Sequence, residues 1–121
     1  MNDNISTDPA AGRGGGLFNL GTASLTNTTV SGNSAPVSGG GIENFGQLRV
    51  NNSRITNNTT QGPGGGIESH NGGVGTATVT LSNSSVTYNK AFTGGGLFNN
   101  SLLTLTGSPI INNAAGEGGG L

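Results

Sequence analysis

The sequence predicts an all-β fold, a parallel β-helix, and two observations support this prediction. A block of three glycines followed by Ile or Leu begins at residues 14, 39, 64, 94 and 118, so it recurs at spacings of 25, 25, 30 and 24 residues. Between the blocks, aliphatic residues return at the same offsets in every unit. Stacked repeats require such recurrence, whereas a disordered tract of similar Gly-, Asn-, Ser- and Thr-rich composition does not.

About four full coils therefore begin near residues 14, 39, 64 and 94, with a partial coil at each end. Each coil contains three short apolar patches, which in the second coil are Ile42, Leu48 with Val50, and Ile55. Each patch is long enough for a strand and too short for a helix. The period-two alternation in "TVTLSNS" is typical of a strand with one buried face. We therefore expect three short strands per coil.

The aliphatic residues fall into four columns when the coils are aligned, and we expect these columns to point inward. Three short strands cannot bury their own apolar face, so each strand must pair in parallel with its equivalent about 4.8 Å away in the next coil. The usual hand of parallel crossover connections makes the helix right-handed. The columns are Leu17, Ile42, Ile67, Leu97 and Leu121; Ala23, Leu48, Val79 and Leu103; Leu25, Val50, Leu81 and Leu105; and Val30, Ile55, Val86 and Ile110.

The glycine blocks and the asparagines are assigned structural roles. The glycines fall between strands, where the backbone turns sharply and neighbouring coils approach closely. They lack the Lys and Ser or Thr of a phosphate-binding loop. An inward Asn amide can satisfy turn backbone groups and bond to its equivalent one coil away, so we expect ladders. Their positions are Asn33, Asn58, Asn89 and Asn113, with Asp8 in the first partial coil, and Asn19, Asn44 and Asn99, with Ser69 substituting once.

Length and composition indicate one β-helix domain over residues 1–121 and exclude several functions. The formal net charge is −1, which provides no electrostatic footprint for nucleic acid. The chain has no cysteine, so a disulfide scaffold or a zinc ribbon is excluded. It has no run of about 20 apolar residues, so we expect no direct membrane insertion. No signal peptide is recognisable in this chain. Because the repeat pattern starts and stops within a coil, we expect a fragment of a longer solenoid whose open ends associate end to end.

The stretches "VSGNSAPVSGGGI", "ITNNTTQGPGGGI", "VTYNKAFTGGGL" and "IINNAAGEGGGL" share an aliphatic residue, an Asn three positions later and a closing Gly-Gly-Gly-aliphatic block. This pattern resembles the short repeats of chlamydial polymorphic outer-membrane proteins and related right-handed parallel β-helix repeats of large bacterial surface proteins. The resemblance covers nearly the whole chain. It implies a secreted or cell-surface passenger, often used in adhesion, with a host surface or a glycan as the partner.

The paired glutamates Glu43 and Glu68 are the best candidates for chemistry. Both follow the aliphatic residue of the first column, so they should stack with His70 two residues further along, while Phe18 and Phe98 flank them in the same column. Paired carboxylates can hold a cation or divide acid and base roles. Two charges about 5 Å apart in water repel by only about 1 kcal/mol. We therefore expect a solvated surface pair, and a weak cation or glycan contact remains the alternative.

We predict a non-catalytic structural or adhesive repeat segment, and we assign no catalytic residue, metal ligand or cofactor. A carbohydrate-binding or carbohydrate-active β-helix, such as a polysaccharide lyase or hydrolase, is the alternative. The other acidic residues, Asp3, Asp8 and Glu117, lie near the chain ends, which argues against an enzyme. The five extra residues of the third coil, within "SHNGGVGTAT", are expected to form a loop, and solenoid insertions often form recognition surfaces.

An ice-binding surface is a further, minor alternative. Flat rows of hydroxyl groups are expected on the outward side of the strands that carry the second and third columns. Arg49, Gln47 and Leu102 interrupt these rows. The outward residues are Thr22, Ser24 and Thr26; Gln47, Arg49 and Asn51; Thr78, Thr80 and Ser82; and Leu102, Thr104 and Thr106.

Overall fold

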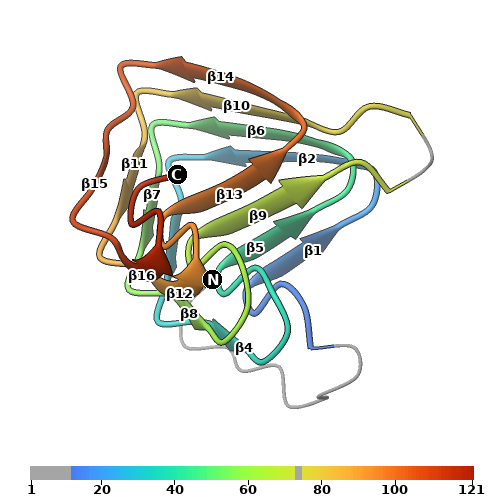
Figure 1. Cartoon of the computed structure of the whole chain (residues 1–121). Coiled ribbons are helices and arrows are strands. Elements are labelled where there is room, and N and C mark those ends of the chain that lie inside the picture. Colours follow the sequence, from blue (N-terminus) through green and yellow to red (C-terminus); the bar gives the residue numbers. More distant parts are fainter. Residues whose placement is uncertain (1–11, 73–74) are drawn as a thin grey trace.

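The computed structural model describes residues 12–72 and 75–121, and every regular element within them is a β-strand. The chain winds into a right-handed parallel β-helix whose coils stack on one another (Figure 1). The fold class predicted from the sequence is therefore confirmed. The described residues contain no helix that is long and apolar enough to cross a membrane.

Four parallel sheets form the sides of the helix, and each takes one strand from every coil. The first sheet contains β1 (Leu17–Asn19), β5 (Ile42–Asn44), β9 (Ile67–His70) and β13 (Leu97–Asn100). The second contains β2 (Thr22–Thr26), β6 (Gln47–Asn51), β10 (Thr78–Ser82) and β14 (Leu102–Thr106). The third contains β3 (Thr29–Ser31), β7 (Arg54–Thr56), β11 (Ser85–Thr87) and β15 (Ile110–Ile111). The fourth contains β4 (Ser34–Ala35), β8 (Thr59–Thr60), β12 (Lys90–Thr93) and β16 (Ala114–Glu117).

The first three sheets contain the three strands per coil that the sequence predicts. The fourth sheet is an addition, made of strands of two to four residues that precede each glycine block. These strands carry few large apolar side chains, so their sequence pattern is weak. Their pairing comes from the stacking of coils that the other three sheets already hold in register.

The predicted aliphatic columns lie in register across the sheets. Ile42 pairs with Leu17 on one side and with Ile67 on the other, and Ile67 also pairs with Leu97. The other three columns pair in the same way. Their buried members form one hydrophobic core that runs along the helix axis. Leu121 differs, because it lies outside the strands and is 61% exposed.

One predicted asparagine ladder runs through all the described coils. Asn33 donates to Asn58, Asn58 donates to Asn89, and Asn89 donates to Asn113, each from Nδ2 to Oδ1 at 3.0 Å. Each of the last three also bonds through Nδ2 to a backbone carbonyl of a neighbouring coil. The ladder therefore satisfies the buried amide groups at these corners and joins each coil to the next. Asp8, which the sequence places at the same position, lies outside the described residues.

The second predicted ladder forms in part. Asn19 Nδ2 donates to Asn44 Oδ1 at 2.7 Å, and Asn44 Nδ2 donates to Ser69 Oγ at 3.0 Å. From Ser69 the next contact is with Ser101 Oγ at 2.9 Å, and Asn99 bonds to Ser101. Ser69 is in register with Asn99, but its shorter side chain contacts Ser101 instead, two residues further along the chain.

The structure also contains a third ladder, made of hydroxyl groups, which was not predicted from the sequence. The backbone N–H of Thr28 donates to Ser53 Oγ at 3.0 Å, that of Ser53 to Ser84 Oγ at 3.1 Å, and that of Ser84 to Ser108 Oγ at 3.1 Å. These residues stand three positions after the third aliphatic column, so the alignment already contained this signal.

The glycine block combines two different requirements. Gly39 is the first glycine of the block in the second coil and has a φ of 58°. A residue with a Cβ is strained in this backbone conformation. At Gly40 the limit is space, because an added Cβ would lie 2.5 Å from the backbone oxygen of Gly65 in the next coil. The first glycine therefore turns the chain, and the following one lets the coils approach closely. Asn52 and Asn57 supply two further corners of positive φ in this coil, which the sequence analysis did not predict.

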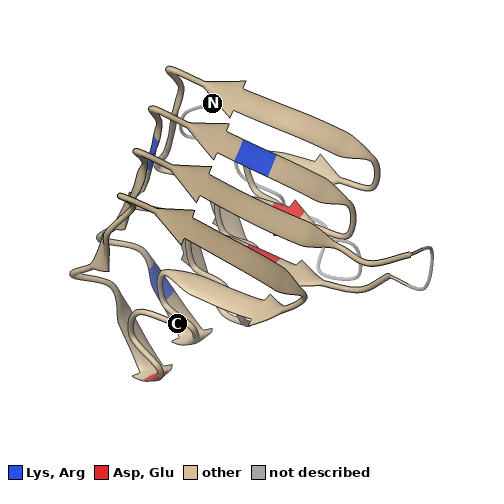
Figure 2. Ribbon diagram, turned by 90° about the horizontal axis from the view of Figure 1, so that it is seen from above, with Lys and Arg blue, Asp and Glu red and all other residues tan. Residues whose placement is uncertain are grey.

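The last coil leaves a residue of an otherwise interior column exposed at the end of the stack. The strands β13, β14, β15 and β16 pair on one side only, and Leu105 in β14 is 40% exposed although its column is otherwise interior. The outward rows of the second sheet lie in register as predicted, with Arg49 among them. Charged residues are few and scattered over the ribbon (Figure 2).

Candidate functional site

The structure brings together the three residues that the sequence singled out. Glu43 lies in β5 and Glu68 in β9, where they are direct neighbours across the first sheet. Phe18 and Phe98 stand on either side in the same row, as predicted. His70 ends β9. Glu43, Glu68 and His70 each offer one ligand atom, and these atoms all lie within 4.8 Å of one another.

The expectation of a solvated surface pair is wrong. Glu43 is 0% exposed and Glu68 is 2% exposed, although both occupy the side of the sheet away from the aliphatic core. Alternation correctly places them on the outer face, but that face is covered rather than open to water. The covering groups come from the chain before the first sheet and from the residues after it.

Phe45 is central to this cover. Its ring lies 4.2 Å from the His70 ring in an edge-to-face arrangement and 5.6 Å from the Phe18 ring. The Arg13 guanidinium stands 5.7 Å from the centre of the Phe45 ring, within the range of a cation–π contact. An added Cβ at Gly72, at the start of the insertion, would lie 2.7 Å from the Phe45 ring, so the chain passes close over it.

Polar contacts hold the two carboxyl groups from opposite sides. Ser38 Oγ donates to Glu43 Oε2, and Glu68 Oε1 bonds to His70 Nδ1. Arg13 Nη1 lies 4.0 Å from Glu43 Oε1, at the outer limit of an ion pair. Within residues 12–72 and 75–121, Glu43 Oε1 and Glu68 Oε2 are the buried side-chain atoms without a hydrogen-bond partner. The cluster is therefore incompletely satisfied.

Burial is the main cause of raised pKa values in this pair. It raises the pKa of Glu43 from 4.5 to about 7, and the negative charge of Glu68 adds to the rise, while the Ser38 hydrogen bond and Arg13 oppose it. Burial likewise raises the pKa of Glu68 to about 7, opposed by a hydrogen bond from Glu43 and by Arg13. In the protonated state Glu43 is thus the donor to Glu68. Near neutral pH the pair retains protons that exposed glutamates lose.

The covering residues escaped the sequence analysis although the repeat alignment contained a signal for them. Phe45 and His70 both stand three residues after the first aliphatic column, in consecutive coils, so stacking places them side by side. Arg13 and Ser38 both stand four residues before that column, and their backbones form a parallel bridge. Neither position carries an aliphatic residue that recurs from coil to coil, so the column pattern does not reveal it.

The insertion of the third coil forms a loop between β9 and β10, as predicted. Asn71 Oδ1 accepts a hydrogen bond from the Ala77 backbone N–H at 2.8 Å, which closes the base of the loop. Its described parts, residues 71–72 and 75–77, extend beyond the edge of the first and second sheets (Figure 1). Because His70 lies directly before it, the loop borders the glutamate cluster.

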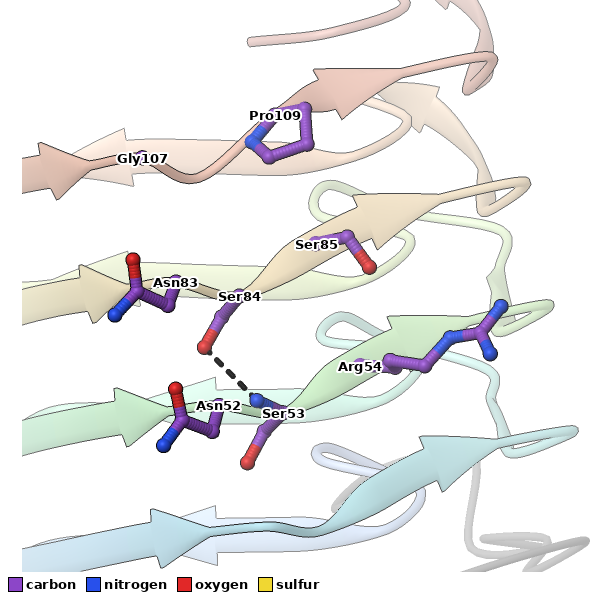
Figure 3. Close-up of a pocket in the computed structure, with 8 residues that line it drawn as sticks. All are labelled: Asn52, Ser53, Arg54, Asn83, Ser84, Ser85, Gly107 and Pro109. Atoms are coloured by element: carbon purple, nitrogen blue, oxygen red, sulfur yellow. Dashed lines mark hydrogen bonds between the residues drawn. The ribbon is translucent and has the colours of Figure 1, made fainter.

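A depression of about 410 Å³ lies at the corner between the second and third sheets (Figure 3). Stacked Asn and Ser residues line it, together with Arg54, Gly107 and Pro109. The Ser84 hydroxyl donates to the Ser82 carbonyl at 2.8 Å and accepts from Ser53 N. Ser53 and Ser84, two of the lining residues, thus belong to the hydroxyl ladder.

Comparison of the chain with models of known protein families, with curated proteins and with solved structures gives no match.

Proposed function

We propose that this chain is a non-catalytic structural segment of a secreted or surface-exposed bacterial protein, in which a rigid solenoid carries an adhesive face. The observation that carries this proposal is the use of polar corner side chains between coils. The asparagine and hydroxyl ladders join one coil to the next instead of facing a cleft. The resemblance to the repeats of bacterial surface proteins supports the location.

The burial of the glutamate pair argues against a carbohydrate-active enzyme. A general acid or base must come within about 3 Å of the atom it protonates or deprotonates in the bound substrate. Glu43 and Glu68 are covered by Phe45, Arg13 and His70, so a sugar ring has no direct path to either carboxyl group. The raised pKa values resemble those of catalytic acids, but here desolvation explains them.

A polysaccharide assay tests the non-catalytic part. The protein is incubated with polyuronates, and unsaturated and reducing ends are measured over time. We expect no product above the level of heat-denatured protein. Turnover that Glu43→Gln or Glu68→Gln abolishes would overturn this part, provided circular dichroism shows that both variants are folded.

A display experiment tests the adhesive part. The chain is fused to a heterologous export and anchor domain, and the bacteria that display it are counted on epithelial monolayers and on glycan-coated surfaces. An equally displayed Ile67→Asp variant, in which the middle coils are unfolded, is the control. We expect adhesion that depends on the folded solenoid. Equal binding by both strains would refute the adhesive role.

A further inference from the structure

Two carboxylate oxygens inside the cover of the first sheet have no partner. Glu43 Oε1 and Glu68 Oε2 are buried without a hydrogen-bond donor from the part of the chain that the structure describes. Their side chains are almost fully shielded from water. Buried polar groups are nearly always paired with protein, ordered water or an ion, because desolvation without a partner is costly. When both carboxyl groups are ionised, the two oxygens therefore have no partner among the described side chains, and only a proton retained on Glu43 would pair them.

The surrounding geometry favours a cation. Glu43 and Glu68 lie on adjacent strands of a parallel sheet in fixed register, and His70 follows Glu68 by two residues on the same strand. One ligand atom from each lies within 4.8 Å of the others, so a single ion between them reaches all three with small side-chain movements. The imidazole side chain is 31% exposed, which leaves a path from solvent.

We propose that Glu43, Glu68 and His70 form a binding site for a divalent transition-metal ion of the zinc type. An imidazole together with two carboxylates suits Zn²⁺ and its first-row neighbours. Ca²⁺ takes six to eight oxygen ligands, and Mg²⁺ seldom uses imidazole. Three protein ligands leave a position for water, as in open zinc sites.

Three neighbours set the properties of this site. Arg13 Nη1 lies 4.0 Å from Glu43 Oε1, so its positive charge opposes the entry of a dication. Phe45 packs edge to face against the His70 ring and limits its rotation. Ser38 holds the other oxygen of Glu43. These contacts orient the ligands in the way that supporting residues do around metal sites.

The bound ion would join the second coil to the third at the base of the insertion loop, because one glutamate comes from each coil. The proposal concerns this chain alone and does not depend on the structural or adhesive role given above. A shared proton between the two carboxyl groups is the competing partner for the orphan oxygens.

Calorimetric titration of the untagged full chain tests the site, since an affinity tag would itself bind metal. The protein is treated with chelator, exchanged into metal-free buffer at pH 8 and titrated with ZnCl₂, and separately with CaCl₂ and MgCl₂. We expect one equivalent of Zn²⁺ to bind and to raise the melting temperature, because a ligand that binds only the folded state stabilises it. We expect Ca²⁺ and Mg²⁺ to have no such effect. Co²⁺ should give visible absorption from its bound ligands.

Four variants make the result specific. Glu43→Gln, Glu68→Gln and His70→Gln should each weaken Zn²⁺ binding by roughly tenfold or more. Glu117→Gln removes an exposed carboxylate elsewhere and should bind as the unaltered chain does. Circular dichroism before titration confirms that each variant is folded. Absence of stoichiometric Zn²⁺ binding, or binding that the two buried-glutamate variants leave unchanged, would overturn the proposal.

Discussion

The buried carboxyl pair makes stability fall as pH rises, and this prediction follows directly from the structure. Each pKa unit corresponds to about 1.4 kcal/mol. A rise from the ordinary value of 4.5 to about 7 therefore corresponds to about 3 kcal/mol for each carboxyl group that ionises in the folded protein. Small domains are stable by only about 5–15 kcal/mol, so ionisation of this pair removes a large part of the total.

The sign follows from proton binding. Between pH 4.5 and 7 the folded state holds protons that the unfolded state has lost, so the free energy of unfolding decreases as pH rises. Stability is greatest below about pH 4.5 with respect to these groups, declines through about pH 7 and then levels off. Among the residues that the structure describes, the polar groups in contact with the pair are Arg13, Ser38 and His70.

Urea unfolding followed by far-ultraviolet circular dichroism at pH 5 and pH 8, with chelator present, measures the effect. We expect the unaltered protein to lose about 3 kcal/mol or more between these values. The double variant Glu43→Gln with Glu68→Gln should lose much less, and at pH 8 it should be the more stable protein. Stability that stays constant or rises from pH 5 to pH 8 would refute the reasoning.

Two controls separate the pair from other titrating groups. His70 bonds to Glu68 through Nδ1, so His70→Gln shows how much of the slope depends on this contact. Glu117→Gln, an exposed glutamate in β16, should keep the full slope.

Four further predictions concern the solenoid. Ile67→Asp should unfold the middle coils in thermal denaturation, since an unpaired buried charge costs several kcal/mol, whereas Ile67→Val should cost about 1 kcal/mol. Asn58→Ala should cost about 3 kcal/mol in urea unfolding because it leaves buried donors and acceptors of the ladder unpaired, and a loss below 1 kcal/mol would count against the ladder. Gly40→Ala should destabilise the protein strongly, because the added Cβ would collide with backbone atoms of the next coil. The control is Gly21→Ala, where the space is open, and the melting temperatures of the two variants are compared. Light scattering across a dilution series should show self-association through the last coil, where Leu105 is 40% exposed. Leu105→Lys should reduce this self-association, and a strictly monomeric protein at high concentration would contradict the expectation.

The sequence by itself determined which residues stack on which. Because each parallel strand repeats its neighbour's offset, the recurrence of Ile42, Ile67 and Leu97 was enough to predict their pairing, the core and the asparagine ladder. The same logic placed Glu43 beside Glu68. Register is a property of the repeat, and a repeat is visible in a sequence.

Only the tertiary structure decided what covers the outer face of the first sheet. Alternation assigns Glu43 and Glu68 to the side away from the core, but it does not state whether that side meets water. Their burial depends on Arg13 and His70, which contact the pair, and on Phe45, which packs on both; these residues are not repeated in every coil. The raised pKa values and the orphan oxygens arise from this cover, so neither follows from a periodic pattern.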